Sequence, residues 1–217
     1  MKAVVVADGE PDARDADHLT DAGLIVAADG GARWLDGVGV RPHVLIGDLD
    51  SVDEDLVARL AAGGTVVERH PVDKDASDAE LAIERALASG AKEVVMLGAL
   101  SGDRLDHELA NLLLLADPSR RVRDLSIVRG GTVVRALHGG ERLSLLGAIG
   151  DLVSLLPIGG DAEGVRTEGL RFPLAGDSLR LGPSRGLSNV VVDPPASVSL
   201  ERGTLLVVEV AREGESS

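Results

Sequence analysis

The sequence predicts an N-terminal doubly wound α/β domain, with a mostly parallel sheet and helices on both faces, followed by an all-β sandwich or barrel. In the first half, short continuous apolar runs alternate with stretches of helical periodicity, a pattern typical of parallel strands buried on both faces. In the second half, short apolar runs are separated by glycine and proline, which is typical of antiparallel strands. We therefore expect two domains, residues 1–122 and 123–217.

The first domain is expected to alternate strands with helices. Its clearest helix covers residues 77–89, where apolar residues recur three and four positions apart. Ser77 and Glu80 form a capping-box pattern at the start of this helix. The expected strands cover residues 2–7, 24–28, 44–46, 65–69 and 93–97, and the other expected helices cover residues 15–22, 32–36, 53–62 and 106–116.

The second domain is expected to consist of short strands, because glycine pairs at residues 130–131, 139–140 and 159–160 mark turns between apolar runs. The tail from residue 213 is expected to fray. The expected strands cover residues 126–129, 132–137, 142–146, 152–157, 178–181, 190–192, 198–201 and 205–210.

The composition excludes several classes of protein. Apolar residues make up 44% of the chain and charged residues 27%, as in soluble globular proteins. No apolar run is long enough to span a bilayer, and the N-terminus lacks the features of a signal peptide, so we expect a cytoplasmic protein without membrane contacts. The net charge of −14 repels phosphate backbones, so no nucleic-acid partner is expected. Without cysteine, disulfides, thiolate metal sites and a cysteine nucleophile are excluded.

Acidic residues follow the strands of the first domain at the points where the strands end. Because the carboxyl ends of parallel strands share one edge of the sheet, ligands bind there, and we expect these side chains to gather. Unpaired, the carboxylates would raise one another's pKa values, whereas Mg²⁺ prefers oxygen ligands and bridges carboxylates to phosphates. The sequence thus predicts a magnesium-dependent, phosphate-handling site. The acids are Asp8, Asp29, Asp48, Asp50, Asp73, Asp75, Asp78, Asp103 and Asp106.

Two of these motifs also have a purely structural interpretation. Asp29 before two glycines could be only a strand-to-helix turn. Ser51 could cap the helix that follows Asp48 and Asp50. For this second motif we favour metal binding, because two carboxylates directly after a buried strand are costly without a cation.

The segment before the helix at residues 77–89 leaves two interpretations open. Asp75 and Asp78 could simply stabilise the helix N-terminus, where negative charge is favourable. Lys74 could be solvated, or it could contact a phosphate. There is no Walker A loop, so ATP would have to be held through metal, carboxylates and Arg or Lys. Structural or surface roles are expected for His18, His43, His70 and His138.

Five segments resemble, in order and spacing, the conserved blocks of thiamine pyrophosphokinases. They are residues 28–32 (ADGGA), 47–51 (GDLDS), 74–80 (KDASDAE), 104–111 (RLDHELAN) and 185–189 (RGLSN). The resemblance implies a Mg²⁺-dependent enzyme that transfers the pyrophosphoryl group of ATP to the hydroxyl of thiamine. It also implies a homodimer, in which the N-terminal domain carries ATP and Mg²⁺ and the C-terminal domain forms the thiamine pocket across the interface.

The resemblance assigns roles by position. The implied metal ligands are Asp48, Asp50 and Asp78, with Asp75 nearby. The implied substrate, phosphate and nucleotide contacts are Asp29, Gly30, Gly31, Lys74, Ser77, Arg104, Asp106, His107 and Asn111. The implied thiamine contacts are Ser188 and Asn189. Asp75 and Asp106 are the two candidate acceptors of the thiamine hydroxyl proton, which completes a catalytic set of Asp48, Asp50, Asp75, Asp78 and Asp106.

The chain departs from the family pattern at three positions. Asp103 adds an acid near the expected phosphate site, Ser77 replaces the usual Thr, and Val190 replaces a frequent acidic residue. Three other functions are compatible with parts of the pattern: a pyrophosphokinase acting on a pterin alcohol, a phosphohydrolase, and a non-catalytic sensor of thiamine or nucleotide. The block at residues 185–189 argues against the first of these, and the complete acidic set argues against the last.

Overall fold

The structure of the chain is a computed structural model that describes residues 1–100, 102, 104–117 and 124–212. The chain divides into two compact units, Met1–Leu114 with Arg123–Gly130, and Leu115–Val122 with Gly131–Ser217. The expected boundary near residues 118–123, the expected frayed tail and Asp103 lie outside the described residues. Among the residues described, no helix is both long and apolar enough to cross a membrane.

The first unit contains six parallel strands in the order β6-β5-β1-β2-β3-β4. The chain moves outward from β1 to β4 and then returns to the other side of β1, which is the doubly wound topology that the apolar runs predict. These strands are β1 (Lys2–Val6), β2 (Leu24–Ala28), β3 (Val44–Gly47), β4 (Val66–Arg69), β5 (Glu93–Leu97) and β6 (Asp124–Arg129).

Strand β6 was expected in the all-β half, but it pairs in parallel with β5, where Val94 lies opposite Leu125. It belongs to the first unit. Its residues 125–128 are all buried, and three of these four are apolar, as in the buried parallel strands β1, β2, β3 and β5. The first unit therefore includes a sixth parallel strand. A short apolar run in the sequence does not by itself show which strand it pairs with.

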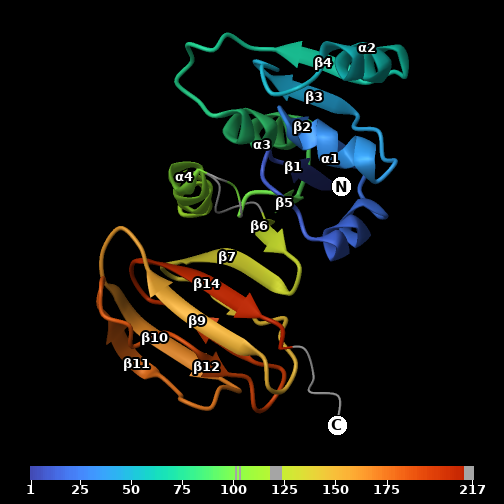
Figure 1. Cartoon of the computed structure of the whole chain (residues 1–217). Helices are drawn as coiled ribbons and strands as arrows, with labels where there is room; N and C mark the ends of the chain where they lie inside the picture. The colour runs from blue at the N-terminus through green and yellow to red at the C-terminus, as the bar shows by residue number, and fades with distance from the viewer. Residues whose placement is uncertain (101, 103, 118–123, 213–217) are drawn as a thin grey trace. The chain divides into compact units, whose positions relative to one another are not determined.

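Four helices of the first unit pack on strands of this sheet (Figure 1). They are the 3₁₀ helix η1 (Ala13–Leu19) and the α-helices α1 (Gly31–Gly37), α2 (Glu54–Ala62) and α3 (Asp78–Ala88), and the helix α4 (Leu105–Leu115) follows β5. The predicted capping of α3 is confirmed, because the Ser77 side chain accepts a hydrogen bond from the Glu80 amide at 3.2 Å. The predicted α-helix at residues 15–22 is instead the 3₁₀ helix η1, which starts at a capping box formed by Asp12 and Asp15.

The second unit is a sandwich of two antiparallel sheets, with strand orders β12-β9-β14-β7 and β11-β10-β13-β8 (Figure 1). Its apolar core includes Leu137, Leu155, Val165 and Leu205 from both sheets. From residue 131 to residue 212 the structure contains no helix, as predicted. The strands are β7 (Thr132–His138), β8 (Arg142–Ser144), β9 (Leu152–Pro157), β10 (Ala162–Glu168), β11 (Ala175–Leu179), β12 (Asn189–Val190), β13 (Ser197–Ser199) and β14 (Thr204–Val210). The sequence analysis missed β10, whose exposed face carries Arg166 and Glu168.

A buried ion pair joins β7 to β14 and fixes the chain after β8. The Arg135 guanidinium contacts the Glu209 carboxylate, and their side chains are only 12% and 5% exposed. Arg135 also donates to the Ser144 carbonyl at 2.9 Å. The second carboxylate oxygen of Glu209 accepts the amides of Leu146 at 2.6 Å and Gly147 at 3.2 Å.

Replacing Arg135 with Met is expected to lower the free energy of unfolding by about 3–5 kcal/mol, because Glu209 would remain buried without its counter-ion. Urea denaturation of the purified variant measures this change. The control is Arg202→Met, which breaks the pair with Glu163 in the same unit, where the side chains are 76% and 44% exposed. An exposed pair of this kind contributes about 1 kcal/mol or less. Equal losses in the two variants would contradict the structural role of the Arg135–Glu209 pair.

Candidate functional site

Three carboxylates converge at the carboxyl edge of the parallel sheet. Asp29 follows β2, Asp48 follows β3, and Asp78 begins α3. One oxygen of each carboxylate lies within 4.8 Å of the other two. We call these three residues the acidic triad. The acids after the strand ends were predicted to gather at this edge, and the family resemblance implied Asp48, Asp50 and Asp78 as metal ligands and Asp29 as part of the substrate site.

The backbone is specifically shaped around the acidic triad. Asp29 and Leu49 have φ angles of 45° and 64°, in the left-handed region that costs free energy for residues other than glycine. Leu49 and Val52 are buried and anchor the chain between β3 and α2. At Gly47 a Cβ atom would lie 3.0 Å from Asp78 Oδ1 and 3.3 Å from Asp29 Cβ, so glycine leaves room for the carboxylates. Tertiary contacts therefore hold the strained conformations that bring the triad together.

Two oxygens of the triad are left without hydrogen bonds. Asp29 Oδ1 and Asp78 Oδ1 are buried and have no hydrogen-bond partner among the described residues. The pKa of Asp29 is raised, mainly by burial. The negative charges of Asp8, Asp48 and Asp78 also raise this pKa, whereas a hydrogen bond with Ser51 lowers it. Buried carboxylate oxygens that accept no hydrogen bond and lie within reach of one another fit the ligand preference of a hard divalent cation such as Mg²⁺.

Lys74 lies against two members of the triad. Its Nζ atom is 3.3 Å from Asp48 Oδ2 and 3.2 Å from Asp78 Oδ1. The second contact is an ion pair by distance but is not aligned as a hydrogen bond. Burial acts to raise the pKa of Asp48, but hydrogen bonds from the Asp50 amide and from Lys74 hold it below the usual value. The structure thus brings Lys74 to the acidic edge, and its contact with a phosphate stays a prediction.

Asp50 and Asp75, the remaining acids of the predicted catalytic set in this region, lie outside the triad. Asp50 is exposed and accepts a hydrogen bond from Ser51 Oγ at 3.1 Å. Its charge still raises the pKa of Asp8, so it lies near the same edge. Asp75 is exposed just before α3. Metal binding by Asp50 stays a prediction, while Asp29 is the third acid that the geometry adds to Asp48 and Asp78.

Sequence reasoning missed an ion pair beside the triad. Arg33, on α1, places Nη2 2.8 Å from Asp8 Oδ1 and donates from Nη1 to the Ser51 carbonyl at 2.9 Å. The position of Asp8 after a strand could have indicated its place at this edge. Nothing in the sequence indicated a role for Arg33, because an arginine in the first turn of a short helix is usually solvated. Gly30 and Gly31, expected to line the substrate site, stand at the start of α1, where Gly30 lies directly beside this pair and Gly31 lies against the main chain of Val6.

The predicted residues around α4 have well-defined partners. Arg104 forms a bidentate pair with Asp106, at 2.9 and 2.7 Å, which lowers the pKa of Asp106 to about 2. His107 is exposed, and its charge acts to lower the pKa of Asp8. Asn111 is buried, and its amide donates to the Ala99 carbonyl at 3.1 Å. This bond gives Asn111 a structural role in seating α4, and its contact with nucleotide stays a prediction.

The predicted thiamine contacts lie in the second unit, next to the exposed Phe172. The Asn189 side chain accepts the Phe172 amide at 3.0 Å and donates to the Phe172 carbonyl at 2.8 Å. Its oxygen also accepts the amide of Val190 at 2.9 Å. Ser188 is exposed and has a φ angle of 56°. Asn189 therefore braces the backbone, whereas Ser188 is presented to solvent, and contact of either residue with thiamine stays a prediction.

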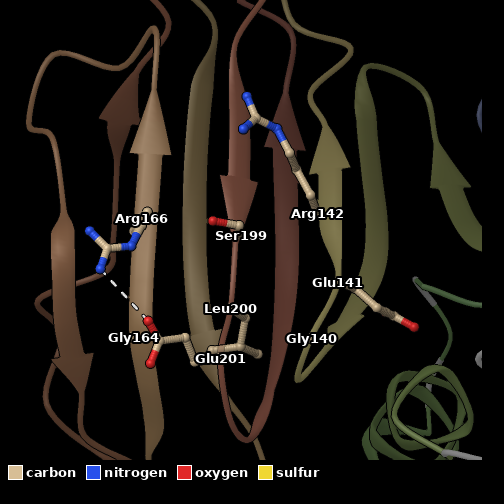
Figure 2. Close-up of a pocket in the computed structure, with 8 residues that line it drawn as sticks. All are labelled: Gly140, Glu141, Arg142, Gly164, Arg166, Ser199, Leu200 and Glu201. Carbon is tan, nitrogen blue, oxygen red and sulfur yellow. Dashed lines mark ion pairs between the residues drawn. The ribbon is translucent and has the colours of Figure 1, made fainter.

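An open depression of about 440 Å³ lies elsewhere on the second unit (Figure 2). Its two arginines are already paired, Arg166 with Glu201 at 3.7 Å and Arg142 with Glu168. None of the predicted site residues lines it. The lining residues are Gly140, Glu141, Arg142, Gly164, Arg166, Ser199, Leu200 and Glu201. We therefore place the candidate site at the acidic edge of the first unit.

Known proteins share this sequence pattern and fold. The family model described as "Thiamin pyrophosphokinase, catalytic domain" matches residues 16–127, and "Thiamin pyrophosphokinase, vitamin B1 binding domain" matches residues 143–205. The thiamine pyrophosphokinase of Bacillus subtilis (strain 168) is 22% identical over 211 residues, which are 96% of this chain and 98% of the relative. Thiamine pyrophosphokinase 1 of Arabidopsis thaliana is 27% identical over 217 residues, with coverages of 90% and 81%.

Solved structures agree in fold. The crystal structure of the Bacillus subtilis thiamine pyrophosphokinase has a TM-score of 0.87 at 22% identity, covering 98% of this chain and 100% of that one. The thiamin pyrophosphokinase of Geobacillus thermodenitrificans has a TM-score of 0.82 at 27% identity, with 99% of both chains covered. The first family model alone spans more than half of the chain. The chain belongs to the thiamine pyrophosphokinase family.

Proposed function

We propose that the chain transfers the pyrophosphoryl group of ATP to the hydroxyl of thiamine at the acidic edge of its first unit, giving thiamine diphosphate and AMP. The observation that carries this proposal is the convergence of the acidic triad, with two buried oxygens that lack hydrogen bonds, in a chain of this family. In such transfers, positioning and electrostatic stabilisation supply most of the catalysis.

Asp29, Asp48 and Asp78 would hold Mg²⁺ in this proposal, with Asp50 as a further ligand. Their oxygens are close enough to share one cation, and oxygen is the ligand that Mg²⁺ prefers. When bound, Mg²⁺ would offset negative charge on the phosphate oxygens. Lys74, held between Asp48 and Asp78, supplies a second positive charge at the same edge. It is placed to orient the phosphates as a point charge.

The acceptor of the thiamine hydroxyl proton is assigned here to Asp75. The sequence left Asp75 and Asp106 as equal candidates. The Arg104 guanidinium holds the pKa of Asp106 at about 2, which makes that carboxylate a weak base. Asp75 lies between Lys74 and the N-cap of α3, close in sequence to Asp78 of the triad. Ser77 is occupied as the N-cap of α3, so its part in phosphate binding would be indirect.

The second unit would complete the thiamine pocket and form a homodimer. Ser188 of the fifth block is exposed, as are Arg185 and Leu187, and in this proposal Ser188 would contact the ligand. Several large apolar side chains of this unit are exposed and would supply the apolar surface of the dimer interface in this proposal. They are Leu146, Ile149, Phe172, Leu181, Leu187 and Val192. Light scattering of the purified protein tests the oligomeric state, and a monomer at micromolar concentration would contradict the homodimer.

The reaction is tested by incubating the purified protein with ATP, Mg²⁺ and thiamine, and by separating the products chromatographically. Equal amounts of AMP and thiamine diphosphate, both lost on adding a chelator, are the expected result. ATP consumption that requires a pterin alcohol instead of thiamine would reassign the acceptor. Thiamine binding without turnover would indicate a sensor instead of an enzyme. Release of inorganic phosphate without an acceptor would indicate a hydrolase.

A further inference from the structure

The Arg33 side chain joins two loops that lie on either side of β2. Strands β1 and β3 flank β2 in the sheet, and α1 follows β2 directly. Arg33, on α1, therefore lies between the carboxyl ends of β1 and β3. Its Nη2 atom lies 2.8 Å from Asp8 Oδ1 after β1, and its Nη1 atom donates to the Ser51 carbonyl after β3 at 2.9 Å.

The second contact fixes the segment of residues 48–53, which we call the β3–α2 loop. This loop carries Asp48 and Asp50. Within the loop, the Asp50 amide donates to Asp48 Oδ1 at 3.3 Å, and Ser51 Oγ donates to Asp50 Oδ1 at 3.1 Å. Lys74 also donates to Asp48 Oδ2 at 3.3 Å, and Asp53 caps α2 by accepting the Asp55 amide at 2.8 Å. Leu49 and Val52 are buried and fix the apolar side of the loop. The polar side is tied to a neighbouring element through Arg33 and the Ser51 carbonyl.

The arrangement also depends on the glycine before α1. A Cβ atom on Gly30 would lie 1.5 Å from Asp8 Oδ1 and 2.8 Å from Arg33 Nη2, so the pair packs directly on the Cα atom of this residue. A guanidinium can donate to two acceptors at once in a fixed geometry. Here one acceptor is the Asp8 carboxylate and the other is a main-chain carbonyl of the β3–α2 loop.

We infer that Arg33 is a positioning residue, which holds the β3–α2 loop, and with it Asp48 and Asp50, against the ends of β1 and β2. This inference rests on the proposed function, because it concerns cation binding by the same acidic edge. Residues that orient metal ligands without touching the metal typically change metal affinity or activity 10- to 100-fold when they are replaced. Arg33 should therefore affect cation binding and turnover much more than folding.

The test compares Arg33→Met with wild type and with a matched control, Arg59→Met. Arg59 pairs with Asp36 at 3.1 and 3.2 Å, and this pair joins α1 to α2 away from the strand ends. Its side chains are 64% and 40% exposed, close to the 57% and 46% of Arg33 and Asp8. We expect Arg33→Met to weaken binding of Mn²⁺, measured by electron paramagnetic resonance without nucleotide, roughly tenfold, and to lower kcat about 10- to 100-fold.

Arg59→Met should match wild type in both measurements, and the two variants should unfold at similar temperatures, because exposed pairs contribute little to stability. A second variant, Arg33→Lys, separates charge from geometry. Lysine keeps the positive charge but cannot bridge the two acceptors as the planar guanidinium does. Its Mn²⁺ affinity should therefore remain close to that of Arg33→Met, and this variant decides the matter if Arg33→Met does not fold.

Two results would overturn the inference: Mn²⁺ affinity and kcat of Arg33→Met equal to those of Arg59→Met, or wild-type Mn²⁺ affinity in Arg33→Lys. A different result would show that the proposed function is wrong. If wild type binds Mn²⁺ but forms no thiamine diphosphate, the assigned reaction is wrong, while the comparison of Mn²⁺ affinities among the variants still tests the role of Arg33.

Discussion

Replacing Asp29 with Asn is expected to lower turnover about 10³-fold, as the loss of an electrostatic stabiliser in an active site typically does. At the same time, the free energy of unfolding should rise in buffer without divalent cations. Asp29 is only 7% exposed, and Oδ1 has no hydrogen-bond partner among the described residues. Asn removes the buried charge at nearly constant volume, and it tolerates the left-handed φ angle of 45° at this position. Opposite effects on activity and stability distinguish a functional residue from a structural one.

The gain in stability should depend on pH. The folded-state pKa of Asp29 is raised above its ordinary value of 3.8. The folded protein therefore binds this proton more tightly than the unfolded chain does. The resulting stabilisation is complete below pH 3.8 and is lost as the pH rises through the folded-state pKa. Denaturant unfolding at several pH values, with a chelator present, should show the advantage of Asp29→Asn growing toward neutral pH.

A variant that loses stability and activity in parallel would contradict the assignment of Asp29 to the acidic triad. Asp50→Asn, measured alongside, tests the ligand that the family resemblance implies. Asp50 is exposed, so its replacement should leave the free energy of unfolding nearly unchanged. A comparable loss of Mg²⁺-dependent turnover would support a role for Asp50 as a ligand beside the triad, and normal turnover would refute it.

The second large effect is expected for Gly31→Ala, at the first residue of α1. A Cβ atom there would lie 2.1 Å from the main-chain oxygen of Val6 and 2.7 Å from its carbonyl carbon. These atoms belong to β1, which is paired on both sides and cannot move without disturbing the sheet. We expect the free energy of unfolding to fall by about 3 kcal/mol, the upper end of the range typical of overpacking. Turnover should also fall, because α1 would shift beside Asp29.

The control for this substitution lies at the other end of the same helix. A Cβ atom on Gly37 would have no heavy atom of the described residues within 4 Å, and Gly37 is exposed. Alanine favours a helix over glycine by about 0.5–1 kcal/mol, so Gly37→Ala should be neutral or stabilising. Urea denaturation of both variants gives the comparison. Equal stability of the two would mean that α1 can move away from β1 at no cost.

Local patterns were sufficient for most elements of the first unit and for the edge that carries the site. Continuous apolar runs identified β1 to β5, and helical spacing with the Ser77 cap identified α3. The position of acids after successive strands indicated that carboxylates would gather, because parallel strands end at one edge. This prediction needs only the order of elements along the chain, and three of the acids that it names, Asp29, Asp48 and Asp78, lie together in the structure.

The tertiary structure decided what depends on pairing between distant segments. The sequence by itself determined a doubly wound domain with an acidic edge, followed by a β domain, since burial patterns and turn residues are local properties. It did not determine that β6 pairs with β5, that Asp29 completes the triad, or that Arg33 ties Asp8 to the chain after β3. Each of these features depends on the direction of a side chain or on the pairing partner of a strand. Packing and hydrogen bonds between residues that are far apart in the sequence select that direction or partner.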